Sequence, residues 1–240
     1  IGYDHTQFLG KTPKKIAGEK AAIIKAGIPA IIGETQEEIK DVFIDRAREA
    51  GSPLSFADQE ISTDLEPVLK GDWQKRNLIT AIATINALIS GGYKVSNENL
   101  RSGVINVITN TGLLGRWQIL QNEPLAICDI GHNPDGIREV LKMINSTPHQ
   151  KLHFVLGLVA DKNAGPVLEL LPRSARYYFC KADIPRALDA KKLQLIAEEK
   201  GLKGSRYDSV KDAYSAAIKN AGDDDLVFVG GSTFVVAEVL

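Results

Sequence analysis

The stretch PLAICDIGHNPDGI, residues 124–137, joins a short apolar run to a cluster of polar and turn-forming residues. The apolar run predicts a buried strand. Asn133 followed by Pro134 is typical of a helix N-cap and first helical position, and apolar residues then recur at helical spacing up to residue 144. The stretch therefore predicts a strand that leads directly into a helix.

The same alternation of strand and helix continues to the end of the chain. We predict strands over 124–130, 151–158, 175–180 and 225–230, and helices over 134–146, 163–171, 190–200, 209–221 and from residue 232. Short apolar strands that alternate with helices favour a mainly parallel sheet covered on both faces. The predicted fold class is α/β.

The first half of the chain has more helical patterns. We predict helices over 13–26, after a capping-box pattern at 35–38, from residue 73 and over 97–108. The stretch that begins at residue 112 contains glycines and a proline but little periodicity. We therefore place a domain boundary there, between residues 116 and 117.

Composition limits the possible functions of the chain. Its 240 residues carry a formal net charge of −1, which gives no basic surface for nucleic acid. The longest apolar region, 21–33, is interrupted by a lysine, a glycine and a proline, so no membrane span is predicted. Cys128 and Cys180 lie in apolar strand-like runs, which predicts buried reduced thiols and fits a cytoplasmic protein.

The beginning of the chain has two notable features. GKT at 10–12 resembles the end of a phosphate-binding P-loop, but His5 stands where that motif needs glycine. This stretch is therefore interpreted as an ordinary helix start. Because residue 1 is Ile rather than Met, we expect the chain to be a fragment of a longer protein.

The start of a helix explains Asn133 but neither Asp129 nor His132. Ligands of parallel α/β sheets bind at the carboxyl ends of the strands. There a carboxylate can accept hydrogen bonds from a ribose diol, and an imidazole beside a helix N-terminus can help to hold a phosphate. The alternative is that Asp129 only fixes the turn through its backbone. Similar junctions at 161–162 and 230–232 are weaker candidates for binding an anion.

Lys20 stands out within the predicted helix 13–26. Its spacing from Ile16, Ile23 and Ile24 places it on their apolar face. One interpretation is that its stem is buried while the ammonium group reaches water. The other is that burial lowers the pKa of the amine, by up to ~3–5 units in extreme cases. A neutral amine can react with carbon dioxide to give a carbamate, which offers Mg²⁺ the oxygen ligands it prefers.

Taken together, several stretches of the chain resemble the folylpolyglutamate synthase/dihydrofolate synthase family, the folate branch of the Mur ligase superfamily. In order along the chain, the stretches are YDHTQFLGKTPKKIAGEKAAIIKAGIPAIIG, QKRNLITAIA, GLLGRWQIL, DIGHNPDG, KADIPRALDA and VFVGGSTFVVAEVL. The resemblance implies an incomplete Mur-ligase ATP-binding domain over 1–116. A Rossmann-like, mainly parallel α/β ligase domain is implied over 117–240.

The resemblance also implies an activity, which is the ATP-dependent addition of L-glutamate to folate or dihydropteroate through an acyl phosphate. The implied cofactors are ATP and Mg²⁺, and the implied partners are these small molecules, with neither nucleic acid nor membrane. We expect a monomer. The family's P-loop-containing N-terminal part is absent from this sequence, so we expect the chain alone to be inactive.

Site residues are carried over from the family one at a time. His5 and a carbamylated, catalytic Lys20 match metal ligands. Asn77 in QKRN matches an adenine contact, Arg116 a phosphate contact, Asp129 a ribose contact and His132 a further nucleotide contact, while Lys162 and Ser232 match positions that face the amino acid. Gly131 stands where the family more often has alanine, and we expect this difference to be harmless.

Two alternative functions remain open at this point. A cell-wall Mur-type ligase shares the ATP site but takes a UDP-linked sugar peptide, although GRWQ and PRALDA favour the folate branch. A non-catalytic α/β nucleotide-binding module would bind ATP or folate without turnover. The residues alone also allow plainer roles, with Asn77 as a helix-surface amide and Arg116 as half of an ion pair.

Overall fold

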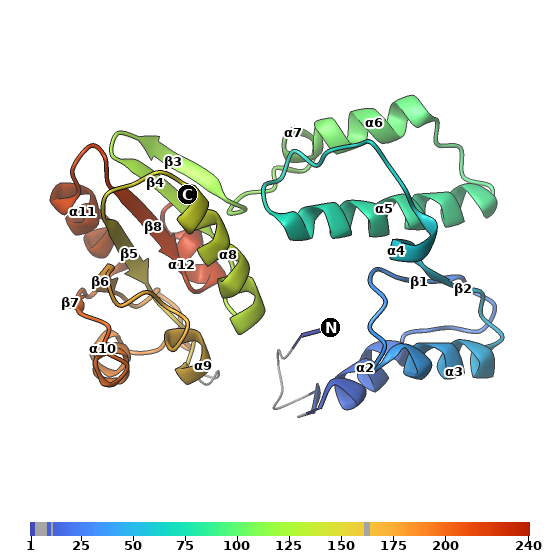
Figure 1. The fold of residues 1–240 in the computed structure, drawn as a ribbon, viewed down its shortest axis with the longest axis horizontal. Helices are drawn as coiled ribbons and strands as arrows, with labels where there is room; N and C mark the ends of the chain where they lie inside the picture. Colours follow the sequence, from blue (N-terminus) through green and yellow to red (C-terminus); the bar gives the residue numbers. More distant parts are fainter. Residues whose placement is uncertain (3–8, 11, 161–163) are drawn as a thin grey trace. The chain divides into compact units, whose positions relative to one another are not determined.

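The structure is a computed structural model that describes residues 1–2, 9–10, 12–160 and 164–240. The chain divides into two compact units, Ile1–Gly112 and Leu113–Leu240, which we call unit 1 and unit 2 (Figure 1). The boundary that we predict from the sequence lies between 116 and 117. Arg116 therefore belongs to unit 2 rather than to the preceding domain.

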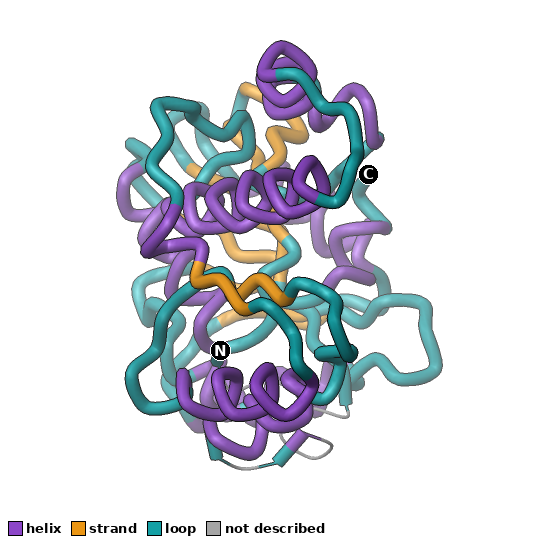
Figure 2. The backbone as a smooth tube through the Cα atoms, turned by 90° about the vertical axis from the view of Figure 1, so that its right-hand side faces the viewer, coloured by secondary structure: helices purple, strands orange, loops and turns teal. Residues whose placement is uncertain are grey.

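Unit 1 contains a two-stranded parallel sheet of β1 (Ala30–Ile32) and β2 (Leu54–Phe56) between layers of helix (Figure 2). Its helices are α2 (Pro13–Ala21), α3 (Lys40–Ala50), α4 (Ala57–Glu60), α5 (Asp72–Ser90), α6 (Asn97–Ile105) and α7 (Val107–Thr111). Helices α2 and α3 pack together through a small core that includes Ala17, Ala21 and Phe43, and α5 contacts β1. The α6 and α7 helices have no fully buried residue.

Two predictions for unit 1 are wrong. The helix predicted over 13–26 ends at Ala21. The capping box predicted at 35–38 does not form, and α3 begins at Lys40 without a side-chain cap. Thr35 is engaged elsewhere, since its hydroxyl donates to Asp58 Oδ1 (2.8 Å) and its backbone N–H donates to Asp58 Oδ2 (2.8 Å).

Unit 2 contains a six-stranded sheet with the strand order β3-β4-β8-β5-β6-β7. The strands are β3 (Gln118–Asn122), β4 (Leu125–Asp129), β5 (Leu152–Leu156), β6 (Arg176–Phe179), β7 (Gly204–Arg206) and β8 (Leu226–Gly230). All neighbouring pairs are parallel except β3 with β4. The register sets Gly230 beside both Asp129 and Leu156, so the carboxyl ends of β4, β8 and β5 meet at one edge.

Helices cover both faces of the unit 2 sheet (Figure 1). On one face lie α8 (Pro134–Ser146), α9 (Gly165–Leu168) and α10 (Ala190–Glu199), and on the other lie α11 (Val210–Asn220) and α12 (Thr233–Ala237). Alternate residues of each strand point to opposite faces. Phe154 thus joins the first core, while Val155 joins the second. The predicted α/β fold with a mainly parallel, doubly covered sheet is confirmed.

Candidate functional site

Asp129 is the last residue of β4, and its side chain is tied to the backbone on two sides. Its Oδ1 accepts a hydrogen bond from Gly131 N (2.8 Å), and its Oδ2 accepts one from Trp117 N (2.8 Å). The residue is 2% exposed. Asp129 therefore does fix the turn, as the plainer interpretation expects. Each carboxylate oxygen still has a second lone pair for a ligand.

The loop before β3 is held against the tip of β4, and it carries Arg116. Ile130 N donates to Gly115 O (3.0 Å), and Gly115 N donates to Gln118 Oε1 (2.8 Å). Gly115 has a φ of 74°, and a Cβ there would lie 2.9 Å from Ile130 Cγ2, so only glycine fits. Trp117 also has a positive φ, of 44°, and its backbone bond to Asp129 holds it there. Arg116, between these two residues, is half-buried.

The electrostatics of Asp129 reflect two opposing effects. Burial raises the pKa of its carboxyl above the ordinary value of 3.8. The hydrogen bonds from Gly131 and Trp117 and the positive charge of Arg116 act in the opposite direction but do not cancel the effect of burial. The positive charge of Arg116 thus acts on the Asp129 carboxyl, and burial remains the larger effect.

His132 and Asn133 form the turn that leads from β4 into α8. His132 Nδ1 lies 3.0 Å from Ile130 O, and a carbonyl can only accept, so Nδ1 carries the proton in this contact. In the neutral ring the other nitrogen, Nε2, is then an acceptor. Asn133 Oδ1 accepts from Gly136 N (2.8 Å), which confirms the predicted N-cap.

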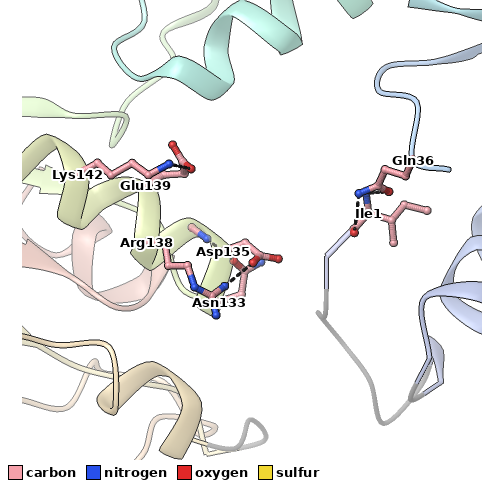
Figure 3. Close-up of polar contacts among 8 residues, drawn as sticks. Ile1, Gln36, Asn133, Asp135, Arg138, Glu139 and Lys142 are labelled. Carbon is pink, nitrogen blue, oxygen red and sulfur yellow. Dashed lines mark hydrogen bonds and ion pairs between the residues drawn. The ribbon is translucent and has the colours of Figure 1, made fainter. Parts of the chain in front are cut away.

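Beyond the cap, α8 carries two ion pairs along its outer side (Figure 3). Asp135 pairs with Arg138 (2.6 Å), and Glu139 pairs with Lys142 (2.7 Å). Both are i,i+3 pairs with exposed cations, and such pairs contribute only about 0.2–1 kcal/mol each. They stabilise the helix, and in both pairs the two partners lie on α8 itself.

The tip of β8 is a close-packed glycine turn that leads into α12. Gly231 has a φ of 93°, and a Cβ there would lie 2.6 Å from Leu156 Cδ1 and 2.8 Å from Gly157 O. Ser232 is 4% exposed and caps α12, because its Oγ accepts from Phe234 N (3.2 Å). The structure thus places Ser232 at the same sheet edge as Asp129. Lys162, the other predicted amino-acid contact, lies outside the described residues.

Asn77 belongs to unit 1, where it borders a pocket of about 320 Å³. The pocket has apolar walls from Ile32, Phe43 and Trp73 and polar groups from Arg76, Asn77 and Thr80. Asn77 is exposed, and its Nδ2 donates to Gln74 Oε1 (3.0 Å). Its amide therefore keeps the carbonyl oxygen and one N–H for a ligand.

The predicted position of Lys20 on a buried stripe is wrong. Lys20 is exposed in the last turn of α2, and Ile23 is 78% exposed. The helix ends at Ala21, so its buried side is formed by Ile16, Ala17 and Ala21 and does not continue to Ile23. The burial that the sequence pattern predicts for Lys20 is therefore absent among the described residues.

The predicted metal site is not assembled within the described part of the chain. His5 lies outside it. Among the residues that the structure describes, no three His, Cys, Asp or Glu side chains gather closely enough to hold a metal ion.

None of the described helices is long and apolar enough to cross a membrane. Both cysteines are buried, as predicted.

Comparison with known proteins shows the class of protein to which the chain is similar. Residues 115–233 match the sequence model of the Mur ligase glutamate ligase domain, which covers the sheet of unit 2 and the start of α12. The dihydrofolate synthase/folylpolyglutamate synthase of Escherichia coli (strain K12) is 30% identical over 259 residues, which are 100% of this chain and 58% of that protein.

Solved structures agree with this class. E. coli FolC in complex with DHPP and ADP superimposes with a TM-score of 0.82 at 30% identity, over 100% of this chain and 58% of that one. A bifunctional folylpolyglutamate synthase/dihydrofolate synthase with Mn, AMPPNP and L-glutamate bound gives 0.82 at 27% identity, over 100% and 59%. The chain belongs to the folylpolyglutamate synthase/dihydrofolate synthase family of the Mur ligase superfamily. It spans 58–60% of the length of two such relatives and 30% of a longer one.

Proposed function

We propose that this chain is part of an ATP-dependent ligase that adds L-glutamate to folate or dihydropteroate. The observation that carries the proposal is the convergence of Arg116, Asp129 and His132 at the tip of β4, where the loop before β3 is tied to the carboxylate of Asp129. Relatives that match the whole chain bear this activity in their names, and the related structures hold ADP, AMPPNP or L-glutamate.

Each of these three side chains has a proposed role with a physical basis. The Asp129 carboxylate keeps free lone pairs and can accept hydrogen bonds from the two ribose hydroxyls. The Arg116 guanidinium supplies positive charge and a fork of donors for phosphate oxygens. His132, whose ring is fixed by Ile130 O, makes a further nucleotide contact. Together they bind the ribose and phosphate groups of ATP.

We assign adenine binding to the pocket beside Asn77. A volume of about 320 Å³ falls at the small end of the range for ligand sites, which is roughly 300–1,000 Å³. The ring systems of Trp73 and Phe43 offer an aromatic base flat apolar surface. The amide of Asn77 can donate to and accept from the edge of adenine, as such amides do in base recognition.

The proposed reaction proceeds through an acyl phosphate. ATP transfers its γ-phosphoryl group to a substrate carboxylate, the amino group of L-glutamate attacks the acyl carbon, and the tetrahedral intermediate collapses to amide and phosphate. A divalent cation, proposed to be Mg²⁺, neutralises phosphate charge when bound.

The proposed ligands of this cation are His5 and a carbamylated Lys20. Lys162 and Ser232 are proposed to face L-glutamate. We further propose a monomeric, cytoplasmic protein.

Carbamylation of Lys20 has a direct spectroscopic test. In ¹³C-labelled bicarbonate, we expect a carbamate signal that disappears in Lys20→Arg and persists in Lys25→Arg. The Lys25 variant is a matched control because Lys25 is a second exposed lysine just beyond the same helix. Equal carbamate signals in wild type and Lys20→Arg would refute the modification at this residue.

Nucleotide affinity tests the proposed function. We expect calorimetry of the 240-residue chain to show that ADP binds more tightly than GDP, and that Asn77→Ala weakens ADP by about tenfold. Asn86→Ala is the matched control, because Asn86 is an exposed asparagine on the same helix, α5. Equal affinities of wild type and Asn77→Ala for ADP would contradict the adenine assignment.

Competition between dihydropteroate and a UDP-muramoyl substrate, measured in a catalytically complete preparation, separates the folate ligase from a cell-wall ligase.

A further inference from the structure

A buried histidine connects three strands at the amino end of the unit 2 sheet. His153 lies on β5, between Tyr178 on β6 and Asp225, which directly precedes β8. Its Nδ1 lies 2.8 Å from Tyr178 Oη, and its Nε2 lies 3.2 Å from Asp225 Oδ2. All three side chains are buried. The ring is thus held from two sides, at the end of the sheet opposite to Asp129.

The Asp225 carboxylate determines which ring nitrogen carries the proton. Although burial opposes this, hydrogen bonds from His153 and from two backbone N–H groups hold the pKa of the Asp225 carboxyl below 3.8. The ionised carboxylate can only accept a hydrogen bond, so Nε2 of His153 is the donor. A neutral imidazole has one donor and one acceptor, so Nδ1 accepts the hydrogen of Tyr178 Oη.

Tyr178 extends this connection to the surface. Asn220, the last residue of α11, makes a side-chain hydrogen bond to Tyr178, and α11 packs against both β5 and β6. Because the Tyr178 hydroxyl already donates to His153, its oxygen accepts from Asn220 Nδ2. Asn220 is exposed. Hydrogen bonds that all point the same way therefore run from Asn220 through Tyr178 to His153, and we call these three residues the relay.

Protonation of His153 is incompatible with this direction of the relay. Both nitrogens of an imidazolium donate, so Tyr178 Oη has to accept from Nδ1, and the tyrosine hydrogen needs a new acceptor. Tyr178 is 1% exposed, and a buried donor without a partner is unfavourable. Rotation of the Asn220 amide by half a turn supplies the acceptor, because Oδ1 then faces Tyr178.

We propose that the relay is an acid-sensitive switch, in which protonation of His153 reverses the hydrogen bonds and turns the exposed amide of Asn220 over. In the neutral state Asn220 presents Oδ1 to water, and in the protonated state it presents Nδ2. Asp225 accepts from Nε2 in both states and keeps the ring in place. The switch does not depend on the proposed function, because it uses none of the residues assigned to ligands.

The charges around the ring place the switch at acidic pH. Burial lowers the pKa of His153 below its ordinary value of 6.5, although the hydrogen bond and the charge of Asp225 oppose this. The positive charges of Arg176 on β6 and Lys151 before β5 add to the lowering. Tyr207 stacks on the tyrosine of the relay, with ring centroids 5.8 Å apart, and α11 reaches the relay through a neutral amide. The relay therefore reverses below about pH 6.5.

Wild-type spectra test the switch without any substitution. Long-range ¹H–¹⁵N spectra of the histidine rings and ¹H–¹⁵N spectra of the side-chain amides are recorded for the 240-residue chain from about pH 8 to about pH 5. We expect His153 to carry a proton on Nε2 alone at the alkaline end and on both nitrogens at the acidic end. The Asn220 Nδ2 signal should shift with the same midpoint, whereas the side-chain amide of Asn86, on α5 in unit 1, should not follow it.

Matched variants test the direction of the relay. Asn220→Asp offers Tyr178 only acceptors, so it should hold the reversed direction and raise the pKa of His153 by about one pH unit. Ser215→Asp adds the same charge at another exposed position of α11, and its effect should be smaller. Tyr178→Phe breaks the relay and should make Asn220 insensitive to the titration of His153. Tyr214→Phe, in a half-buried tyrosine of α11, should leave the two residues coupled.

Four results overturn the inference. One is a His153 ring that carries its proton on Nδ1 at the alkaline end, and another is an Asn220 signal that stays constant through the midpoint of His153. A third is a His153 that stays neutral until unit 2 unfolds, with unfolding followed by Trp117 fluorescence in a Trp73→Phe background. The fourth is an equal pKa of His153 in Asn220→Asp and Ser215→Asp.

Discussion

Asp129 is buried at the end of β4, and the charge of Arg116 partly compensates for that burial. We predict that Arg116→Gln raises the pKa of the Asp129 carboxyl further above 3.8, because one of the effects that lower it is removed. ¹³C NMR of the aspartate carboxyls measures this pKa. Arg138→Gln on α8 is the control, and it should leave Asp129 unchanged because Arg138 pairs with Asp135. An unchanged pKa in Arg116→Gln would place Arg116 away from the carboxylate.

His153 lies at the opposite end of the unit 2 sheet, in a buried network that the proposed function does not use. It is 2% exposed, and its ring nitrogens lie 2.8 Å from Tyr178 Oη and 3.2 Å from Asp225 Oδ2. Burial lowers the pKa of His153 below its ordinary value of 6.5, although Asp225 opposes this. For Asp225, burial alone would raise the pKa, but hydrogen bonds from Gly222 N, His153 and Lys151 N lower it below 3.8.

Both shifts have the same consequence for stability. A lowered pKa in the folded state means that the contribution to stability is complete above the unfolded pKa and is lost as the pH falls through the folded pKa. We therefore predict that unit 2 loses stability as the pH falls below about 6.5. In His153→Gln the free energy of unfolding should depend less on pH in this window.

Trp117 fluorescence in a Trp73→Phe background follows the unfolding of unit 2 alone, because the chain has two tryptophans. His149→Gln is the control, because the His149 ring is only half-buried and its Nδ1 contacts the carbonyl oxygen of Thr147 (2.7 Å). An equally flat profile in wild type would contradict the prediction.

The role of a residue can be predicted from the sequence where its partner lies only a few residues away along the chain. The cap at Asn133 depends on a backbone N–H three residues away, so the short sequence pattern suffices. The exposure of Lys20 depends on where α2 ends and on what packs against it, and periodicity alone fixes neither. The bond from Trp117 N to Asp129 requires a positive φ at a tryptophan, which no sequence pattern indicates.

At the scale of elements, the turn between β8 and α12 has a stringent requirement for glycine. We predict that Gly231→Ala destabilises unit 2 by about 1–3 kcal/mol, because its φ of 93° suits glycine alone and the new Cβ would meet Gly157 O. Denaturant unfolding followed by Trp117 fluorescence measures the change. Gly222→Ala is the control, because its Cβ would meet only Asp225 Oδ2, at 3.7 Å. Equal stability of the two variants would show that this turn tolerates a side chain.

The elements that the sequence predicts are those buried on both faces. Strands β4, β5 and β8 consist mostly of buried residues, so their apolar runs are continuous. Strands β1, β2 and β7 have three residues each and β3 is a partly exposed edge strand, so none offers a long enough apolar pattern. The sheet's central strands were therefore predictable, whereas its edges and the small sheet of unit 1 were not.

At the scale of the whole molecule, the chain spans 58–60% of two relatives whose names carry the ligase activity. The 240-residue sequence contains no P-loop motif, the loop that usually binds the γ-phosphate. We predict that the purified 240-residue chain forms no glutamylated product from ATP, Mg²⁺, dihydropteroate and L-glutamate. Mass spectrometry of the reaction mixture checks this, and the E. coli relative is the positive control. Product above the background of a protein-free mixture would contradict the prediction.

¹H–¹⁵N backbone spectra of the chain during titration with ADP and Mg²⁺ show where the nucleotide binds. We predict that the amide signals of Gly115, Arg116 and Trp117 and of residues 129–133 shift together and saturate at one ADP concentration. Signals that stay unchanged there, or that shift only around His153 and Asp225 at the opposite end of the sheet, would contradict it.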